Sequence, residues 1–156
     1  MNTNEEVITH FYTCFKNKDI KGMQDCYAHN TIFNDAVFSN LNAIQVLSMW
    51  EMLIKSGKDM RLEFDHVQAD ERTATANWLA YYTFSATGNK VVNKVKASFI
   101  LENGKIISHT DDFDFYQWAK QALGVTGLLL GWTPFLKNKI RKRAADNLRL
   151  YMARID

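Results

Sequence analysis

The residues best suited to chemistry lie close together in residues 109 to 114, HTDDFD. His109 and Asp111 are two residues apart, and side chains two apart on a β-strand point to the same face. An imidazole next to a carboxylate can relay a proton, and a carboxylate enclosed by aromatic rings is a stronger proton acceptor than one in water. The pair therefore predicts general acid–base chemistry by Asp111 with His109.

Two further residues are candidates for the same site. Asp35 follows Asn34 near the end of a predicted strand, where the Asn-Asp pair is equally suited to a turn. Lys96 lies on the neighbouring strand, where an ion pair with Asp111 would take away the base. His109 has an alternative too, as a hydrogen-bonded core histidine. Five aromatic residues are predicted either to line a pocket for a flat apolar ligand or to pack in the core: Trp50, Trp78, Tyr82, Phe84 and Phe113.

A β-hairpin is expected to position the His-Asp pair. Asn103-Gly104 favours a two-residue turn, so residues 90–102 and 105–116 are predicted to pair antiparallel. Alternation along the second strand gives one face with His109 and Asp111, together with Ile107, Phe113 and Phe115. Asp112 and Asp114 fall on the opposite, polar face.

The remaining periodicities place helices first and strands afterwards. Helices are predicted over residues 4–17, 19–27 and 42–57, with a short strand over 31–38 between the last two, and alternating strands follow over 61–69 and 72–86. This order predicts an α+β fold: a curved antiparallel sheet of four to six strands that forms a cone, with the N-terminal helices over its concave face.

A C-terminal helical extension, residues 119–156, is expected to pack on the same domain as residues 1–118. Thr133-Pro134 favours the start of its final helix. Its large apolar residues are predicted to be buried as a wall or lid of the cavity: Leu128, Leu129, Leu130, Trp132, Phe135 and Leu136. The basic run 137–143 is read as a solvated helix face, with a membrane surface or an acidic partner as the alternative.

Composition narrows the class of protein. The chain has 156 residues and a net charge of +2, which fits one globular domain and does not favour a nucleic-acid partner. Cys14 and Cys26 lack metal-ligand spacing, so we expect buried free thiols, no metal and no cofactor. No apolar run is long enough to span a membrane, and a cytoplasmic location is expected. Apolar residues on both faces of strands 72–86 and 90–102 predict a homodimer through the outer face of the sheet.

The order of elements, with YAHNTIFNDAVF at its head and GKIISHTDDFDF at its tail, resembles the nuclear transport factor 2-like superfamily over residues 4–118. That group includes ketosteroid isomerase, SnoaL-type polyketide cyclases and limonene-epoxide hydrolase. WLAYYTFSATGNKVVNK together with HTDDFDFYQWAKQALGVTGLLLGWTP is similar to a SnoaL-like subfamily with this extension and with no assigned function. The resemblance implies a cavity for a small hydrophobic or polyketide-like molecule and, where there is catalysis, a cofactor-independent isomerase, cyclase or epoxide-hydrolase-like enzyme.

The family resemblance transfers only some of the catalytic residues. Asp35 matches the general-base aspartate of the isomerases, but Phe11 and Lys96 stand where those enzymes keep their two oxyanion-hole donors. Asp111 matches the last-strand carboxylate of the epoxide hydrolase and Lys94 loosely replaces its arginine, while Lys96 stands in place of its other aspartate. Two hypotheses remain: ligand binding with acid–base catalysis by Asp111 and His109, or a non-catalytic binding or dimerisation module with a closed polar network.

Overall fold

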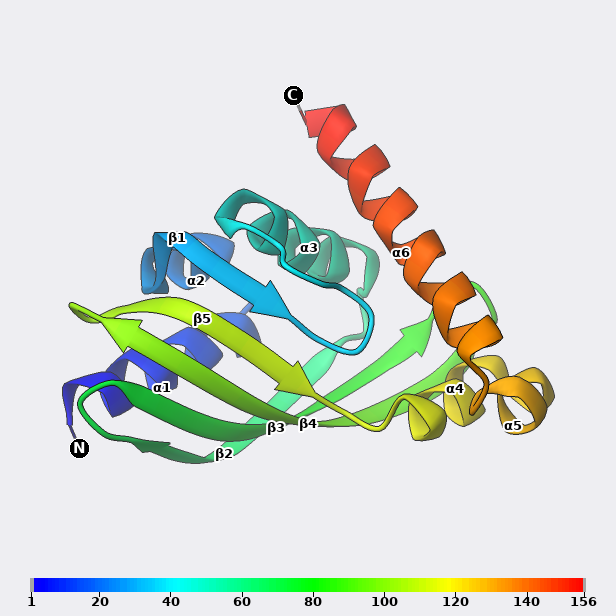
Figure 1. Ribbon diagram of the computed structural model, residues 1–156, viewed down its shortest axis with the longest axis horizontal. Coiled ribbons are helices and arrows are strands. Elements are labelled where there is room, and N and C mark those ends of the chain that lie inside the picture. Colours follow the sequence, from blue (N-terminus) through cyan, green and yellow to red (C-terminus); the bar gives the residue numbers. More distant parts are fainter. Residues whose placement is uncertain (1, 156) are drawn as a thin grey trace.

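A computed structural model of the chain describes residues 2–155 and has the predicted α+β architecture. The elements follow in the order α1 (Thr3–Lys16), α2 (Ile20–Cys26), β1 (Tyr27–Asn34), α3 (Ala43–Ser56), β2 (Arg61–Ala69), β3 (Thr73–Phe84), β4 (Asn89–Glu102), β5 (Lys105–Asp112), α4 (Phe115–Leu123), α5 (Val125–Leu130) and α6 (Pro134–Ile155). Figure 1 shows the sheet curling around α1, with α3 farther from the long strands.

The strands form one five-stranded sheet in the order β1-β5-β4-β3-β2. Strands β2 to β5 make the predicted antiparallel meander, and β1 adds to its edge in parallel with β5. Asn103 and Gly104 both have positive φ, as the predicted tight turn requires. The β1 strand begins at Tyr27, earlier than expected, because it continues directly from the end of α2.

A β-bulge in β5 changes the face of its first residues. Leu101 pairs with Ile106, but Ile100 pairs with Ser108, so Ile107 has no partner in the ladder. Ile106 is fully buried in place of Ile107, while His109 and Asp111 keep the predicted interior face. The expected placement of Ile107 on that face was therefore wrong, because an unpaired residue reverses the alternation.

The β5 strand is also shorter than predicted. It ends at Asp112, and the side chain of Asp114 accepts a hydrogen bond from the backbone N–H of Gln117, which caps α4. Alternating Asp and Phe residues resemble a strand in the sequence. The local capping bond favours a helix instead, so Phe115 is the first residue of α4 and not the last inward residue of β5.

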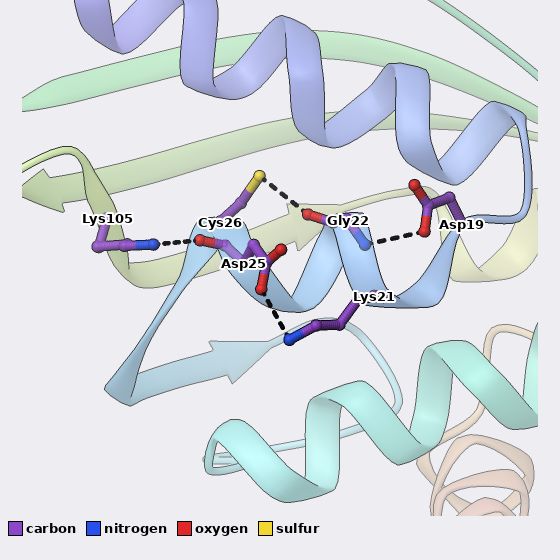
Figure 2. A network of polar contacts seen from close by, with 6 residues as sticks. All are labelled: Asp19, Lys21, Gly22, Asp25, Cys26 and Lys105. Carbon is purple, nitrogen blue, oxygen red and sulfur yellow. Dashed lines mark hydrogen bonds and ion pairs between the residues drawn. The ribbon is translucent and has the colours of Figure 1, made fainter.

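The short helix α2 is attached at both ends, as Figure 2 shows. Asp19 caps it by accepting from the N–H of Gly22, and Lys105 at the start of β5 donates to the carbonyl of Asp25. The second contact holds the end of α2, and therefore the start of β1, beside β5. The Cys26 thiol donates to the carbonyl of Gly22, and burial raises its pKa to about 12, so the predicted buried free thiol is confirmed and is a poor nucleophile.

Helices α1 and α3 bury one face each against the sheet. The cap of α1 is Asn2, whose side chain accepts from the N–H of Glu5, and α3 begins with a reciprocal capping box between Asn42 and Gln45. Aromatic residues of both helices meet those of β3 and β4 in one continuous core that includes Phe11, Tyr12, Phe15, Trp50, Trp78 and Phe99.

The C-terminal helices are only partly buried. Leu136 and Leu148 of α6 are buried, whereas Leu128, Leu129, Leu130, Trp132 and Phe135 are exposed. The expectation that this apolar group is buried against its own domain therefore holds for Leu136 and was wrong for the other five residues. Gly127 faces α4, which turns the three leucines that follow it outward. No helix among residues 2–155 is both long enough and apolar enough to cross a membrane.

Candidate functional site

A chain of hydrogen bonds runs through the centre of the molecule and ends at Asp111. The Trp50 indole N–H donates to the Tyr27 hydroxyl oxygen at 3.0 Å, and that hydroxyl lies 2.8 Å from Nδ1 of His109. His109 Nε2 lies 2.9 Å from Oδ1 of Asp111, which also accepts from the Trp78 indole N–H at 3.4 Å. All five side chains are buried, so this series of hydrogen bonds connects α3, β1, β5 and β3 inside the core.

The bonding pattern fixes where the protons lie. Burial raises the pKa of Tyr27 well above its ordinary value, so the phenol keeps its proton. Its oxygen already accepts from Trp50, and its O–H then donates to Nδ1 of His109. The remaining ring nitrogen, Nε2, carries the hydrogen and donates to Asp111. Oδ1 of Asp111 thus receives two N–H donors, and Oδ2 is the oxygen that can exchange a proton with a ligand.

His109 is held in place by aromatic rings as well as by hydrogen bonds. Phe99 and Phe33 have ring centroids 4.3 and 4.9 Å from the imidazole centroid, and Phe11 and Trp50 lie somewhat farther away. The residue is only 1% exposed. His109 therefore orients Asp111 from behind and does not itself reach a bound molecule.

A cavity of about 440 Å³ opens on the other side of Asp111. It lies between α3, the ends of β3 and β4, and α6, and this volume is within the range of small-molecule sites. All five aromatic candidates line it, together with Asp35 and Asp111: Trp50, Trp78, Tyr82, Phe84 and Phe113. Arg143 and Asn147 of α6 and Asn93 of β4 add polar groups to a wall that is mostly apolar.

Asp35 is the second carboxylate of the cavity. Its Oδ1 accepts from the backbone N–H groups of Val37 and Phe38 at 2.8 and 2.7 Å. Asp35 therefore stabilises a turn, as the alternative from the sequence proposed, and also lines the cavity. Burial, and to a smaller extent the charge of Asp111, raises its pKa to about 6 against the effect of those two hydrogen bonds. Asp35 can therefore change its protonation near neutral pH inside the cavity.

Lys96 does not belong to this cluster. It pairs with Asp112 on the outer face of the sheet and is exposed, while Asp111 pairs with Ala97. The bulge at Ile107 shifts the register by one residue, and without it Asp111 would lie opposite Lys96. No ion pair between Lys96 and Asp111 occurs in the part of the chain that the structure describes. The position of Lys96 therefore leaves Asp111 free of a neutralising cation.

Tyr27 was not singled out as a site residue by the sequence, although it connects Trp50 to His109. Its role depends on the parallel pairing of β1 with β5, in which Tyr27 lies opposite Ile106. The extension was expected to form a wall or lid of the cavity, but the residues with which α6 lines it were not identified: Ile140, Arg143 and Ala144. Across residues 2–155 no three His, Cys, Asp or Glu residues come together as metal ligands.

The raised pKa of Asp35 makes the stability of the protein depend on pH. Below about pH 4 this carboxyl is protonated in the folded and in the unfolded chain, and between about pH 4 and 6 only the folded protein keeps the proton. Stability contributed by Asp35 is therefore lost as the pH rises through about 6. We expect Asp35→Asn to match the wild type at pH 4 and to exceed its free energy of unfolding by about 1–3 kcal/mol at pH 8.

Urea unfolding at several pH values measures this difference. Asp112→Asn, which replaces an exposed aspartate of the outer face, is the matched control and should change the free energy of unfolding at pH 8 by no more than about 0.5 kcal/mol. A difference between Asp35→Asn and the wild type that is the same at pH 4 and pH 8 would contradict the assignment.

The comparisons with known proteins agree with this fold. A family model described as a SnoaL-like domain matches residues 8–109. IdmH from Streptomyces antibioticus, proposed to be a polyketide cyclase, has a TM-score of 0.67 at 16% identity and covers 80% of this chain and 100% of its own. An LEH-like epoxide hydrolase from M. tuberculosis has a TM-score of 0.64 at 16% identity, with 82% and 96% covered.

A third solved structure, TerC co-crystallised with polyporic acid, has a TM-score of 0.66 at 16% identity and covers 77% of this chain and 98% of its own. No curated protein matches the chain in sequence. At these identities the solved structures show a shared fold, and the functional conclusion depends on the residues of the cavity.

Proposed function

The chain belongs to the SnoaL-like domain family, and from that membership we propose that its cavity binds a small, mainly apolar molecule on which Asp111 acts as a proton acceptor. The observation that carries the proposal is the placement of one carboxylate, oriented from behind by His109 and Trp78, in the wall of an aromatic cavity. A cone fold shared with cyclases and epoxide hydrolases supports a ligand-binding or isomerase-type role.

The proposed chemistry is proton transfer of the isomerase, cyclase or hydratase type. Oδ2 of Asp111 takes a proton from a carbon next to a carbonyl group or from a water molecule, and the electron pair of the broken bond moves to the carbonyl oxygen or to the attacking oxygen. Asp35, with a pKa of about 6, returns a proton elsewhere on the ligand. His109 keeps Asp111 in orientation and is a positioning residue, since it does not line the cavity.

The second hypothesis, a non-catalytic binding module, has one observation in its favour. Each polar group from Trp50 to Asp111 finds a partner inside the protein, so the network is stable without a bound molecule. Binding alone then needs only the aromatic cavity. The two hypotheses are separated by a substitution that keeps the hydrogen bonds of Asp111 but cannot accept a proton. Such a substitution abolishes function if Asp111 is a catalytic base, and it leaves function intact if the cavity only binds a ligand. The homodimer and the cytoplasmic location expected from the sequence stay predictions.

Calorimetric titration with 2-naphthol, a flat phenol that fits a cavity of this size, tests the proposed binding. A ligand of this size gains about 0.5 kcal/mol per non-hydrogen atom, which gives a Kd on the order of 100 µM. We expect Ala144→Phe, which fills the cavity from α6, to weaken binding at least about tenfold. Ala145→Phe changes the neighbouring exposed position, which does not line the cavity, and should bind like the wild type. Equal affinity in both variants would mean that naphthol binds elsewhere.

A further inference from the structure

An apolar surface projects from the end of the molecule formed by α4, α5 and the start of α6, at the right of Figure 1. We call it the apolar tip and define it by its exposed large side chains: Val125, Leu128, Leu129, Leu130, Trp132 and Phe135. Trp132 and Phe135 are 70% and 71% exposed, although such side chains are rarely left in water. A contiguous group of this kind on a monomer marks an interaction surface.

The apolar tip is built rigidly. Gly127 and Gly131 pack so closely on Ala119 of α4 that an added Cβ would lie 1.8 Å from the Ala119 carbonyl oxygen at Gly127 and 2.9 Å from the Ala119 Cβ at Gly131. The Tyr116 hydroxyl donates to the carbonyl of Leu128, and the Trp132 indole N–H donates to that of Leu129. The leucines therefore point outward because the opposite side of α5 is fixed to α4.

The charged residues of the segment that forms the apolar tip are all basic. Residues 115–145 contain six Lys or Arg and no Asp or Glu. Lys120 lies over the ring of Tyr116 at 4.7 Å, beside α5, and Lys137 lies over Phe115 at 5.6 Å. Lys139 is exposed and follows Phe135 by four residues, on the same face of α6, whereas Lys142 forms an ion pair with Asp146 at 3.2 Å. Cations therefore surround the exposed rings and leucines.

We propose that the apolar tip docks on an anionic lipid bilayer, with its rings and leucines in the headgroup boundary and the cations against acidic headgroups. Segments that bind at the membrane interface typically combine apolar residues, including Trp and Phe, with Lys and Arg beside them. The basic residues add electrostatic attraction to an anionic lipid surface. A second copy of the chain fits less well, because a two-fold contact would bring Lys120, Lys137 and Lys139 of one copy close to the same three cations of the other.

Co-sedimentation of the full chain with lipid vesicles tests the proposal. We expect binding to vesicles of phosphatidylcholine with about one third phosphatidylglycerol, at least tenfold weaker binding to phosphatidylcholine alone, and release by salt, since surface charge attraction is screened. The double variant W132S/F135S should lose at least tenfold in affinity for anionic vesicles. Ile44→Ser removes an equally exposed apolar residue of α3 and should bind like the wild type.

Lys139→Gln with Lys120→Gln tests the cationic part separately. This variant should lose affinity for anionic vesicles and keep its weak affinity for neutral ones. Light scattering on the same proteins identifies the other occupants. If W132S/F135S changes the oligomeric state, the apolar tip is a contact between copies and the proposal is overturned. It is also overturned if the wild type does not bind anionic vesicles, which would leave an acidic protein partner as the occupant. None of these measurements depends on ligand binding in the cavity beside Asp111, so they test the apolar tip independently of the proposed function.

Discussion

Replacing Asp111 by alanine is expected to lower the free energy of unfolding by about 2–5 kcal/mol, because two buried donors lose their acceptor at a cost of about 1–3 kcal/mol each. The substitution leaves the His109 Nε2–H and the Trp78 indole N–H without their acceptor in a core where both residues are under 10% exposed. A buried donor without a partner loses its hydration and gains nothing in return. Urea or guanidinium unfolding measures the loss.

Asp111→Asn is the matched variant, because an amide Oδ1 can still accept both N–H groups. We expect it to fold with a loss of about 1 kcal/mol or less, since every donor keeps a partner. It has no oxygen that can take up a proton, so any proton transfer in the cavity should stop. If alanine and asparagine destabilise the protein equally, the carboxylate charge itself holds the core together. If neither destabilises it, the hydrogen-bond chain is not formed in solution.

Gly127→Ala is expected to lower the free energy of unfolding by about 2–3 kcal/mol, a typical cost of overpacking. The added Cβ would lie 1.8 Å from the carbonyl oxygen of Ala119, and a backbone atom in α4 cannot rotate away. The higher helix propensity of alanine, about 1 kcal/mol, offsets only part of this. We expect α5 to separate from α4 and the backbone amides of both helices to exchange faster with solvent.

Thermal unfolding and hydrogen exchange measure this effect. Thr126→Ala places an alanine at the exposed position immediately before Gly127, adds no atom to the contact with α4, and should melt within about 1 °C of the wild type. A Gly127→Ala protein that melts like the wild type and has unchanged exchange in α4 would show that the two helices are not in close contact.

The sequence predicted those parts of the fold that depend on local patterns. Asn103-Gly104 predicted the β4–β5 hairpin, and the helix predicted over 42–57 begins at its Asn42 cap, because turn and cap preferences act over three or four residues. Alternation then put His109 and Asp111 on the interior face. The α4 helix was missed because the cap at Asp114 and the strand-like alternation of Asp and Phe compete over the same few residues.

The parts that were not predicted depend on contacts between distant segments. The single unpaired residue Ile107 moved Lys96 from opposite Asp111 to opposite Asp112, and no local signal in the sequence specifies that bulge. Tyr27 reaches His109 only because β1 pairs in parallel with β5 across 82 residues of chain. The exposure of the apolar tip follows from the close approach of Gly127 to α4, which spacing alone does not reveal.

A crystal structure of the protein with bound 2-naphthol is the most direct test of the cavity as a ligand site with Asp111 as its proton acceptor. We expect the naphthol rings to lie between Trp50, Trp78 and Phe113. The naphthol hydroxyl should lie within hydrogen-bond distance, about 2.5–3.0 Å, of Oδ2 of Asp111. Naphthol bound outside the cavity, or bound inside it with its hydroxyl turned away from Asp111, would contradict the proposed role of this carboxylate.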